Sequence, residues 1–443
     1  MSDESVPALN APAPGRDNPL TRSIAGVLGL VFLSAIVLAC VVTLPWTLGK
    51  DSAYAAADAG GALGSSVTAE SRANQSGGAP RYNAGTPKAG RLPPSWWPPR
   101  EDDALRMHEL VEPAVVAQIA ARHEVSAAEA MKSSSGPISR ELNAASPVGT
   151  HWLRHSMGTD VLGRSLLYRC LTGGGISLLI GIAAALLSVV IGTVYGAVSG
   201  YAGGRVDAVL MRIVDILYGL PYILLVVLLA VAVDSIVERR LTARVAAVAV
   251  ERQALVAREL EALPEHDRAA PGTTKRLEEA ALDRLGTGEI SLGVQNSINV
   301  VTLLVAIGGV SWLTMARVVR GQVLSLKNQP FIEAARAIGV PTRRIFTRHL
   351  LPNLLGPITV YATLTVPQAI LQESFLSFLG IGVKPPLPSW GNLAADGLSE
   401  LNPYQSNWWL LLFPCLLLGT TLLALNFVGE GLREAFDPKR GKR

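Results

Sequence analysis

Six long apolar segments divide this 443-residue chain, at about residues 24–46, 176–199, 213–233, 298–316, 355–376 and 408–428. Each is long enough, at roughly 20 residues, to cross a ~30 Å hydrocarbon layer as an α-helix. Hydrophobic residues make up 49% of the chain and charged residues 17%, a balance suited to a lipid environment. The pattern predicts an all-α polytopic membrane protein with six transmembrane helices.

Positive charge predicts the orientation. In the loop 317–354, between the fourth and fifth segments, most of the charged residues are arginines, and Glu333 is the single acid. The tail 431–443 is also basic. By the positive-inside rule both are cytoplasmic, and an even number of spans places the tail 1–22 on the same side.

Two long inserts are therefore expected to face outward. The first, residues 49–170, follows a first transmembrane helix at 23–48. Its stretch 55–95 is rich in Gly, Ala, Ser and Pro, which predicts a flexible linker. Residues 101–131 have the charged, Ala-rich pattern of helices outside the membrane.

The second insert, residues 235–295, divides a core of five helices that spans 171–430. Residues 236–263 are patterned as a helix, and Pro264 and Pro271 are expected to break the helical run. Because long loops cross a membrane regardless of charge, the arginines of this insert do not contradict an outward location.

The loop 317–354 contains a candidate docking helix. Pro330 suits a first helical turn, and Gly339 followed by Pro341 is a stop signal. Four residues between them have the spacing of one apolar helix face, whereas Glu333 and Arg336 point elsewhere: Phe331, Ala334, Ala335 and Ile338. We expect a short, well-capped helix.

A second short helix is expected to follow in the same loop. It starts at Thr342, and four residues form its apolar positions: Ile345, Phe346, His349 and Leu350. Leu351-Pro352 is expected to break the run before the next hydrophobic segment. The two short helices together would form one compact loop.

A strip of small residues recurs every fourth position in the second span, at Ser188, Gly192, Gly196 and Gly200. Small side chains let a neighbouring helix backbone approach closely, which is how membrane helices gain packing. We therefore expect this strip to be a helix-packing surface.

Glu373, near the outer end of the fifth span, is the deepest ionisable residue, with Gln368 and Ser374 nearby. An intramembrane carboxylate is unfavourable by several kcal/mol unless it faces a partner or a watered cavity. These three residues are candidates for lining a pathway. The sequence leaves open the alternative that Glu373 lies just outside the membrane and caps the segment 374–382.

At the third span, Arg212 and Asp215 are three residues apart and can pair on one helix face, and we expect these charges to anchor the span at the cytosolic edge. Gly219-Leu220-Pro221 then predicts a kink, which can be a hinge or only a feature of shape. Three tryptophans at span ends are expected to act as interfacial anchors: Trp46, Trp408 and Trp409.

The sequence lacks the motifs of several kinds of catalytic and metal-binding site. The sequence has no Gly-x-x-x-x-Gly-Lys-Ser/Thr phosphate loop, so ATP hydrolysis is not expected in this chain. It has no His-Glu-x-x-His, and its three cysteines have neither metal-site nor disulfide spacing. We expect no catalytic residues, no metal, no cofactor and no nucleic-acid partner. A channel or secondary transporter is a weaker alternative, because paired broken helices with midplane charges are not evident.

The sequence motif of the expected docking loop resembles that of bacterial ABC importer permeases. Glu333-Ala334-Ala335, Gly339 and Leu351-Pro352 match the loop by which such permeases engage their ATPase, with His349 where the general pattern is aliphatic. Further likeness, over about 145–235 and 295–438, is to the C-type subunit of the dipeptide and oligopeptide importers. Its motifs are Gly158–Arg164, Arg212–Leu217, Leu376–Val383 and Pro388–Gly391.

This resemblance implies a type I ABC importer permease core with two extended periplasmic insertions, in the bacterial inner membrane with both termini cytoplasmic. It implies a heterodimer with a homologous permease, two cytosolic ABC ATPases and a periplasmic solute-binding protein. Nine residues would couple to the ATPase: Phe331, Glu333, Ala334, Ala335, Arg336, Ile338, Gly339, Leu351 and Pro352. The implied cargo is a peptide. A nickel complex, glutathione or a sugar remains an alternative, because both inserts are longer than usual for this branch.

Overall fold

The computed structural model describes residues 24–50, 80–268, 270 and 272–436. The tail 1–22, the stretch 55–79 of the expected linker and the basic residues 439–443 lie outside the described residues. Five described helices are long and apolar enough to cross a membrane, and a bent helix pair can supply a sixth span. The five are α1 (Ile24–Leu48), α9 (Leu166–Ala202), α14 (Leu292–Leu326), α17 (Leu351–Phe378) and α19 (Trp409–Phe436). This arrangement confirms the predicted all-α membrane architecture.

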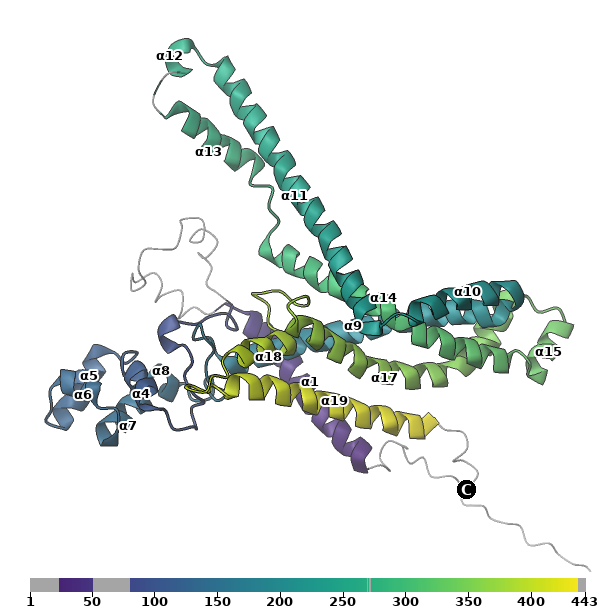
Figure 1. Cartoon of the computed structure of the whole chain (residues 1–443), viewed down its shortest axis with the longest axis horizontal. Coiled ribbons are helices and arrows are strands. Elements are labelled where there is room, and N and C mark those ends of the chain that lie inside the picture. The colour runs from purple at the N-terminus through teal and green to yellow at the C-terminus, as the bar shows by residue number, and fades with distance from the viewer. Residues whose placement is uncertain (1–23, 51–79, 269, 271, 437–443) are drawn as a thin grey trace, which may run out of the picture.

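The centre of the bundle is the packing of α9 against α14 and α17. Buried apolar side chains from the three helices meet there, including Ile180, Ile307 and Leu376. α1 and α19 pack against each other and along α9 and cover one side of this centre. Figure 1 shows α9, α14, α17 and α19 running along one direction, with the first insert at one end and the short helix α15 (Pro330–Ala337) at the other.

The glycine strip of α9 lies directly against α14. A Cβ added at Gly192 would lie 2.5 Å from the Cβ of Met315. At Gly196 it would lie 2.3 Å from the carbonyl oxygen of Ala316. At Gly200 it would lie 2.9 Å from the Arg320 carbonyl oxygen. Ser188 is also buried. The absence of side chains therefore sets how closely the two helix backbones approach.

The third span is not one helix. α10 (Gly204–Tyr218) and α11 (Tyr222–Ala262) are bent by 92° at Gly219-Leu220-Pro221. The predicted kink is therefore a sharp bend within the predicted span 213–233, and the bent pair can count as the sixth span. Proline removes a backbone donor and its ring clashes with the preceding helical turn, so the helix ends and restarts in a new direction.

The second insert is an arm that projects from the bundle (Figure 1). α11 continues without interruption from its apolar start to Ala262, so the expected separate helix 236–263 is an extension of a span. α12 (Glu265–Arg268) forms the tip, and α13 (Thr273–Leu285) returns along α11. The break at Pro264 thus lies where the sequence predicts it, whereas Pro271 is outside the described residues.

The first insert is a small helical unit at the outer end of the bundle (Figure 1). Its helices are α4 (Glu101–His108), α5 (Pro113–Arg122), α6 (Ala127–Lys132), α7 (Gly136–Ala145) and α8 (Pro147–Thr150). Their apolar faces enclose a core that contains Ile119, Ala130 and Leu142. Within 80–95, where a flexible linker is expected, Ala84 and Leu92 are almost completely buried. That part of the linker prediction is wrong, because these side chains pack against folded neighbours.

Charged residues join this insert to the bundle. Asp160 accepts hydrogen bonds from Arg164 Nε at 2.7 Å and from Arg169 NH1 at 2.6 Å. Arg91 pairs with Glu400 through Nε at 2.6 Å, and this hydrogen bond lowers the pKa of Glu400. Arg169 belongs to α9 and Glu400 follows α18, so the pairs of Asp160 with Arg169 and of Arg91 with Glu400 hold the insert on the bundle.

Trp409 does not act as an exposed anchor. It is 1% exposed, and its indole Nε1 donates to the Thr159 carbonyl oxygen at 3.5 Å. Trp390, at the start of α18 (Trp390–Ser399), is also fully buried and donates to the Cys170 carbonyl oxygen at 3.1 Å. Trp409 is therefore part of the outer core, and the prediction of an interfacial role for it is wrong.

His155 is expected to make the stability of the first insert depend on pH. Burial lowers its pKa from 6.5 to about 4. The unfolded histidine therefore binds a proton at a higher pH than the folded one. The stabilisation is complete above pH 6.5 and is lost as the pH falls towards 4, by about 2 kcal/mol at pH 5.

Hydrogen-exchange protection factors of residues 101–150, compared at pH 7 and pH 5, measure this effect. The variant His155→Asn should lose most of the pH dependence between those two values. A variant that retains the full dependence would assign the effect to another group.

Candidate functional site

The short helix α15 has well-defined ends. It begins after Gln329, with Pro330 in its first turn. Gly339 has a φ of 77°, the left-handed region that favours glycine. The amide of Gly339 donates to the Arg336 carbonyl oxygen at 3.0 Å, and that of Val340 donates to the Ala335 carbonyl oxygen at 3.0 Å. These two bonds form a Schellman cap, so the helix ends where the sequence predicts.

One face of α15 is packed and the opposite side is open. Ile332 and Ala335 are buried with Ile345 and Leu350, in a cluster that we call the loop core. Phe331 is 42% exposed and Ile338 is 80% exposed. The predicted single face is therefore divided. Ala335 is buried in the loop core and is not on the solvent-exposed side of the helix. Ala334 and the polar residues Glu333 and Arg336 are exposed.

The loop core reaches two spans. Tyr201 from α9 and Leu326 from α14 pack against it. The Arg336 guanidinium lies 5.3 Å from the centre of the Tyr201 ring. The buried side of α15 therefore contacts the adjoining ends of both helices.

The second short helix joins the fifth span without a break. α16 (Thr342–Ile345) passes through a π-helical turn (Phe346–Leu350) into α17. Pro352 lies in the first turn of α17, where its missing donor is harmless. The predicted break at Leu351-Pro352 is therefore wrong, and α16 is a direct extension of a transmembrane helix. His349 packs beside the ring of Phe331, with centroids 6.5 Å apart.

A bidentate ion pair joins α10 to α14 near this loop. Arg320 donates to both carboxylate oxygens of Asp207, from Nε at 2.5 Å and from NH2 at 2.6 Å. Ser199 donates to the same carboxylate at 2.5 Å. Lys327, one residue beyond α14, donates to the Gly200 carbonyl oxygen at 2.9 Å. Charge and backbone contacts thus hold the ends of α9, α10 and α14 together.

Asp215 pairs with Arg317 of α14, at 2.8 Å from NH2, and not with Arg212. The Arg317 guanidinium also lies 4.0 Å from the centre of the Tyr218 ring. The spacing of charges at the start of the third span indicated paired residues. It could not show that the partners come from a helix about 100 residues later, because pairing across helices depends on tertiary packing.

Glu373 is enclosed by hydroxyl groups. It is fully buried in α17 and accepts hydrogen bonds from Ser377 at 2.7 Å and from Ser374 at 3.3 Å. Hydrogen bonds also link it to Ser177 and Ser389. Of the three candidate pathway residues, Glu373 and Ser374 are buried in this structure, and Gln368 is exposed. Glu373 therefore faces hydrogen-bond partners and not a watered cavity.

A second cluster of polar side chains connects three of the long helices. The Tyr222 hydroxyl lies 2.8 Å from the Ser311 hydroxyl and donates to Gln372 Oε1 at 2.9 Å. These residues come from α11, α14 and α17. Tyr222 is the first residue after the 92° bend, so this group helps to hold the direction in which α11 leaves the bundle.

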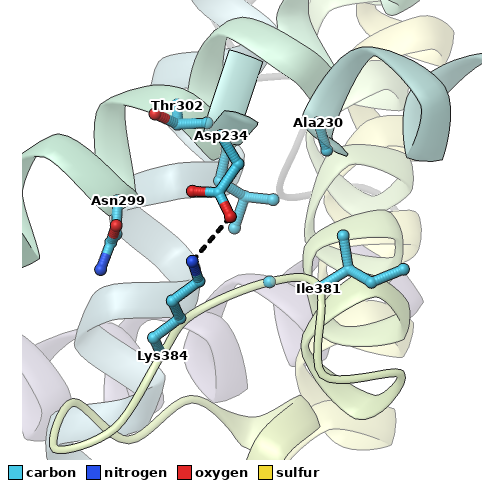
Figure 2. Close-up of a pocket in the computed structure, with 8 residues that line it drawn as sticks. Ala230, Asp234, Asn299, Thr302, Ile381 and Lys384 are labelled. Carbon is cyan, nitrogen blue, oxygen red and sulfur yellow. Dashed lines mark hydrogen bonds and ion pairs between the residues drawn. The ribbon is translucent and has the colours of Figure 1, made fainter. Parts of the chain in front are cut away.

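A small pocket lies further along α11 (Figure 2). Lys384 Nζ lies 2.6 Å from Asp234 Oδ2, and Asn299 and Thr302 from α14 line the same pocket. The ion pair joins α11 to the loop after α17, and both side chains are partly exposed. This ion pair was not predicted from the sequence. An aspartate that ends an apolar run, together with a lysine beside Pro385-Pro386, was the only available signal.

The geometry defines a class of protein. A bundle of helices long and apolar enough to span a membrane carries the short capped helix α15 at one end and the first helical insert at the other, and a helical arm projects from its side. Among the described residues, no group of His, Cys, Asp and Glu has the arrangement of a metal site. These features are those of a multi-pass membrane protein, and the comparisons with known proteins agree with that class.

The chain belongs to the family of binding-protein-dependent transport system inner membrane components, whose profile matches residues 188–442. It is 40% identical over 285 residues to the oligopeptide transport system permease protein OppC of Haemophilus influenzae, covering 64% of this chain and 70% of the relative. It is 39% identical over 293 residues to the dipeptide transport system permease protein DppC of Bacillus subtilis, covering 66% and 70%. OppC of Escherichia coli K12 is 42% identical over 287 residues, covering 64% and 72%.

These matches confirm the resemblance to importer permeases. The chain is a multi-pass permease subunit of the inner membrane, and ATP hydrolysis belongs to separate ATPase subunits. A subunit of this kind works with ATPase and binding-protein partners.

Proposed function

We propose that this chain forms half of a translocation pathway for di- or oligopeptides, paired with a homologous permease subunit. The names of the relatives, which are oligopeptide and dipeptide permeases, support a peptide cargo. We further propose that α15 is the docking helix for one of two cytosolic ATPases. The observation that carries this proposal is a capped helix with a packed inner side and two open apolar side chains, Phe331 and Ile338.

The mounting of α15 supports a lever mechanism. A moving ATPase displaces α15 as a rigid body, because the Schellman cap and the loop core leave it little freedom. The displacement passes to α9 and α14 through the loop core and to α17 through the continuous helix that starts at Thr342. Tilting of these spans then opens a central path first to one side and then to the other.

The orientation follows from charge. Arg343, Arg344 and Arg348 are exposed on the loop that carries α15, which supports a cytosolic location for this end. Both chain termini would then be cytoplasmic, and the two inserts would face the periplasm and the solute-binding protein. Gln368, which is exposed on α17, remains our candidate for a pathway-lining residue.

Transport by the reconstituted system tests the cargo. The chain, its permease partner, the ATPases and the binding protein are placed in lipid vesicles, and uptake of labelled dipeptides and oligopeptides is measured with and without ATP. We expect ATP-dependent peptide uptake that requires the binding protein. Uptake of glutathione, a nickel complex or a sugar in place of peptides would contradict the peptide cargo. Failure of the chain to assemble with any ATPase would contradict the docking role of α15.

A further inference from the structure

The outer end of the bundle carries a group of exposed large apolar side chains. Trp96 is 59% exposed, Trp97 45%, Trp152 64% and Leu153 62%. All four belong to the first insert, outside the 188–442 range that the family profile matches. Together with Trp408 we call them the outer aromatic patch. A cluster of this kind, exposed on one surface, indicates an interaction site.

The patch is held in place by hydrogen bonds. Trp96 Nε1 donates to the Ser156 carbonyl oxygen at 2.7 Å. Ser95 Oγ donates to the Trp152 carbonyl oxygen at 2.9 Å. The two loops that carry the patch are therefore tied to each other. The exposed rings are fixed features of the folded insert and do not result from a loose chain.

The patch is continuous with the surface of a transmembrane helix. The ring of Trp97 lies 5.2 Å from that of Trp408, and the ring of Trp96 lies 6.3 Å from it. Trp408 immediately precedes α19, and Leu412 and Leu416 lie one and two turns further along. Both leucines are nearly half exposed, at 45% and 49%. An exposed apolar strip on a membrane-spanning helix faces lipid, so the patch lies where this strip leaves the membrane.

We propose that the outer aromatic patch docks the first insert onto the outer leaflet of the lipid bilayer, at the boundary between headgroups and acyl chains. Tryptophan is enriched at this depth because its ring is apolar and its indole N–H is polar. Three tryptophans beside the end of a span match this environment. The insert then rests on the membrane beside the bundle, which fixes its height relative to the binding protein.

Fluorescence quenching tests the contact with lipid. The assembled complex is placed in nanodiscs that contain lipids brominated near the carbonyl end of the acyl chains. Emission of the unmodified complex is compared with that of a variant carrying Trp96→Phe, Trp97→Phe and Trp152→Phe. The difference isolates the three patch rings. We expect the brominated lipids to remove most of this difference emission.

A matched control uses Tyr404, which is 95% exposed in the loop before α19. Emission added by Tyr404→Trp should be quenched by acrylamide in the water and not by brominated lipids. The single variant Trp152→Phe keeps the test valid if the triple variant does not fold. Difference emission that brominated lipids leave unchanged would overturn the proposal, including the outcome in which only added binding protein alters it.

Discussion

Replacing Phe331 and Ile338 together by alanine should weaken docking of the ATPase and lower both stimulated ATP hydrolysis and transport. Both side chains are exposed on the open side of α15, so their removal leaves the loop core of Ile332 and Leu350 intact. Burial of one such side chain in a partner is worth about 1.5–3 kcal/mol. Loss of both corresponds to at least about 3 kcal/mol, or about 100-fold weaker docking of the ATPase. Binding-protein-stimulated ATP hydrolysis and peptide uptake should fall together.

The readouts are ATPase co-purification, stimulated hydrolysis and uptake in proteoliposomes. Leu186→Ala is a matched control, because Leu186 is 63% exposed on α9 and far from α15 in the sequence. We expect this control to leave coupling unchanged. If the double variant also transports at the unmodified rate, then α15 is not the docking helix. Equal thermal stability of both variants would show that the effect acts on docking and not on folding.

Gly196→Ala should strongly destabilise the bundle, by about 3 kcal/mol. Its Cβ would lie 2.3 Å from the carbonyl oxygen of Ala316 and 3.0 Å from the amide nitrogen of Arg320. Both atoms are backbone, so relief requires α9 and α14 to move apart. The movement would also strain the bidentate contact between Arg320 and Asp207. Transport driven by ATP hydrolysis should also decrease, because the loop core contacts both α9 and α14.

Two glycines provide controls for this substitution. An added Cβ at Gly321 of α14 or Gly419 of α19 meets nothing within 4 Å. Alanine there should be neutral or slightly stabilising, because alanine favours helix more than glycine does. Thermal unfolding of the purified chain in detergent compares the three variants. A Gly196→Ala protein as stable as the two controls would mean that close approach of the backbones is unimportant for this fold.

Much of the structure of the loop 317–354 could be predicted from local sequence. Pro330 and Gly339 define the two ends of α15 because their backbone preferences act within a few residues. The same local rules failed at Pro352, where a π-helical turn connects α16 to α17. They also failed for Ala335, since four apolar residues at helical spacing do not reveal which of them a neighbouring helix covers.

Polar contacts between segments distant in the chain could not be predicted from the sequence. Asp215 and Glu373 were evident from the sequence as charges beside or within apolar segments. Asp215, however, pairs with Arg317 of α14, and the partners of Glu373 include Ser177 of α9 and Ser389 before α18. Periodicity describes one element at a time, whereas an ion pair between helices depends on how two elements are rotated and spaced. For the same reason the fold of residues 80–95 was missed, because a composition rich in small residues is typical of a linker.

The sequence by itself determined that the chain spans a membrane, that its basic loop contains a short capped helix, and that a glycine strip would pack. These properties arise from hydrophobic length, backbone preference and side-chain size, which act locally. Only the tertiary structure decided the 92° turn after α10, the partners of the buried charges and the exposed rings beside Trp408. Each of these depends on the relative placement of segments that are distant in the chain.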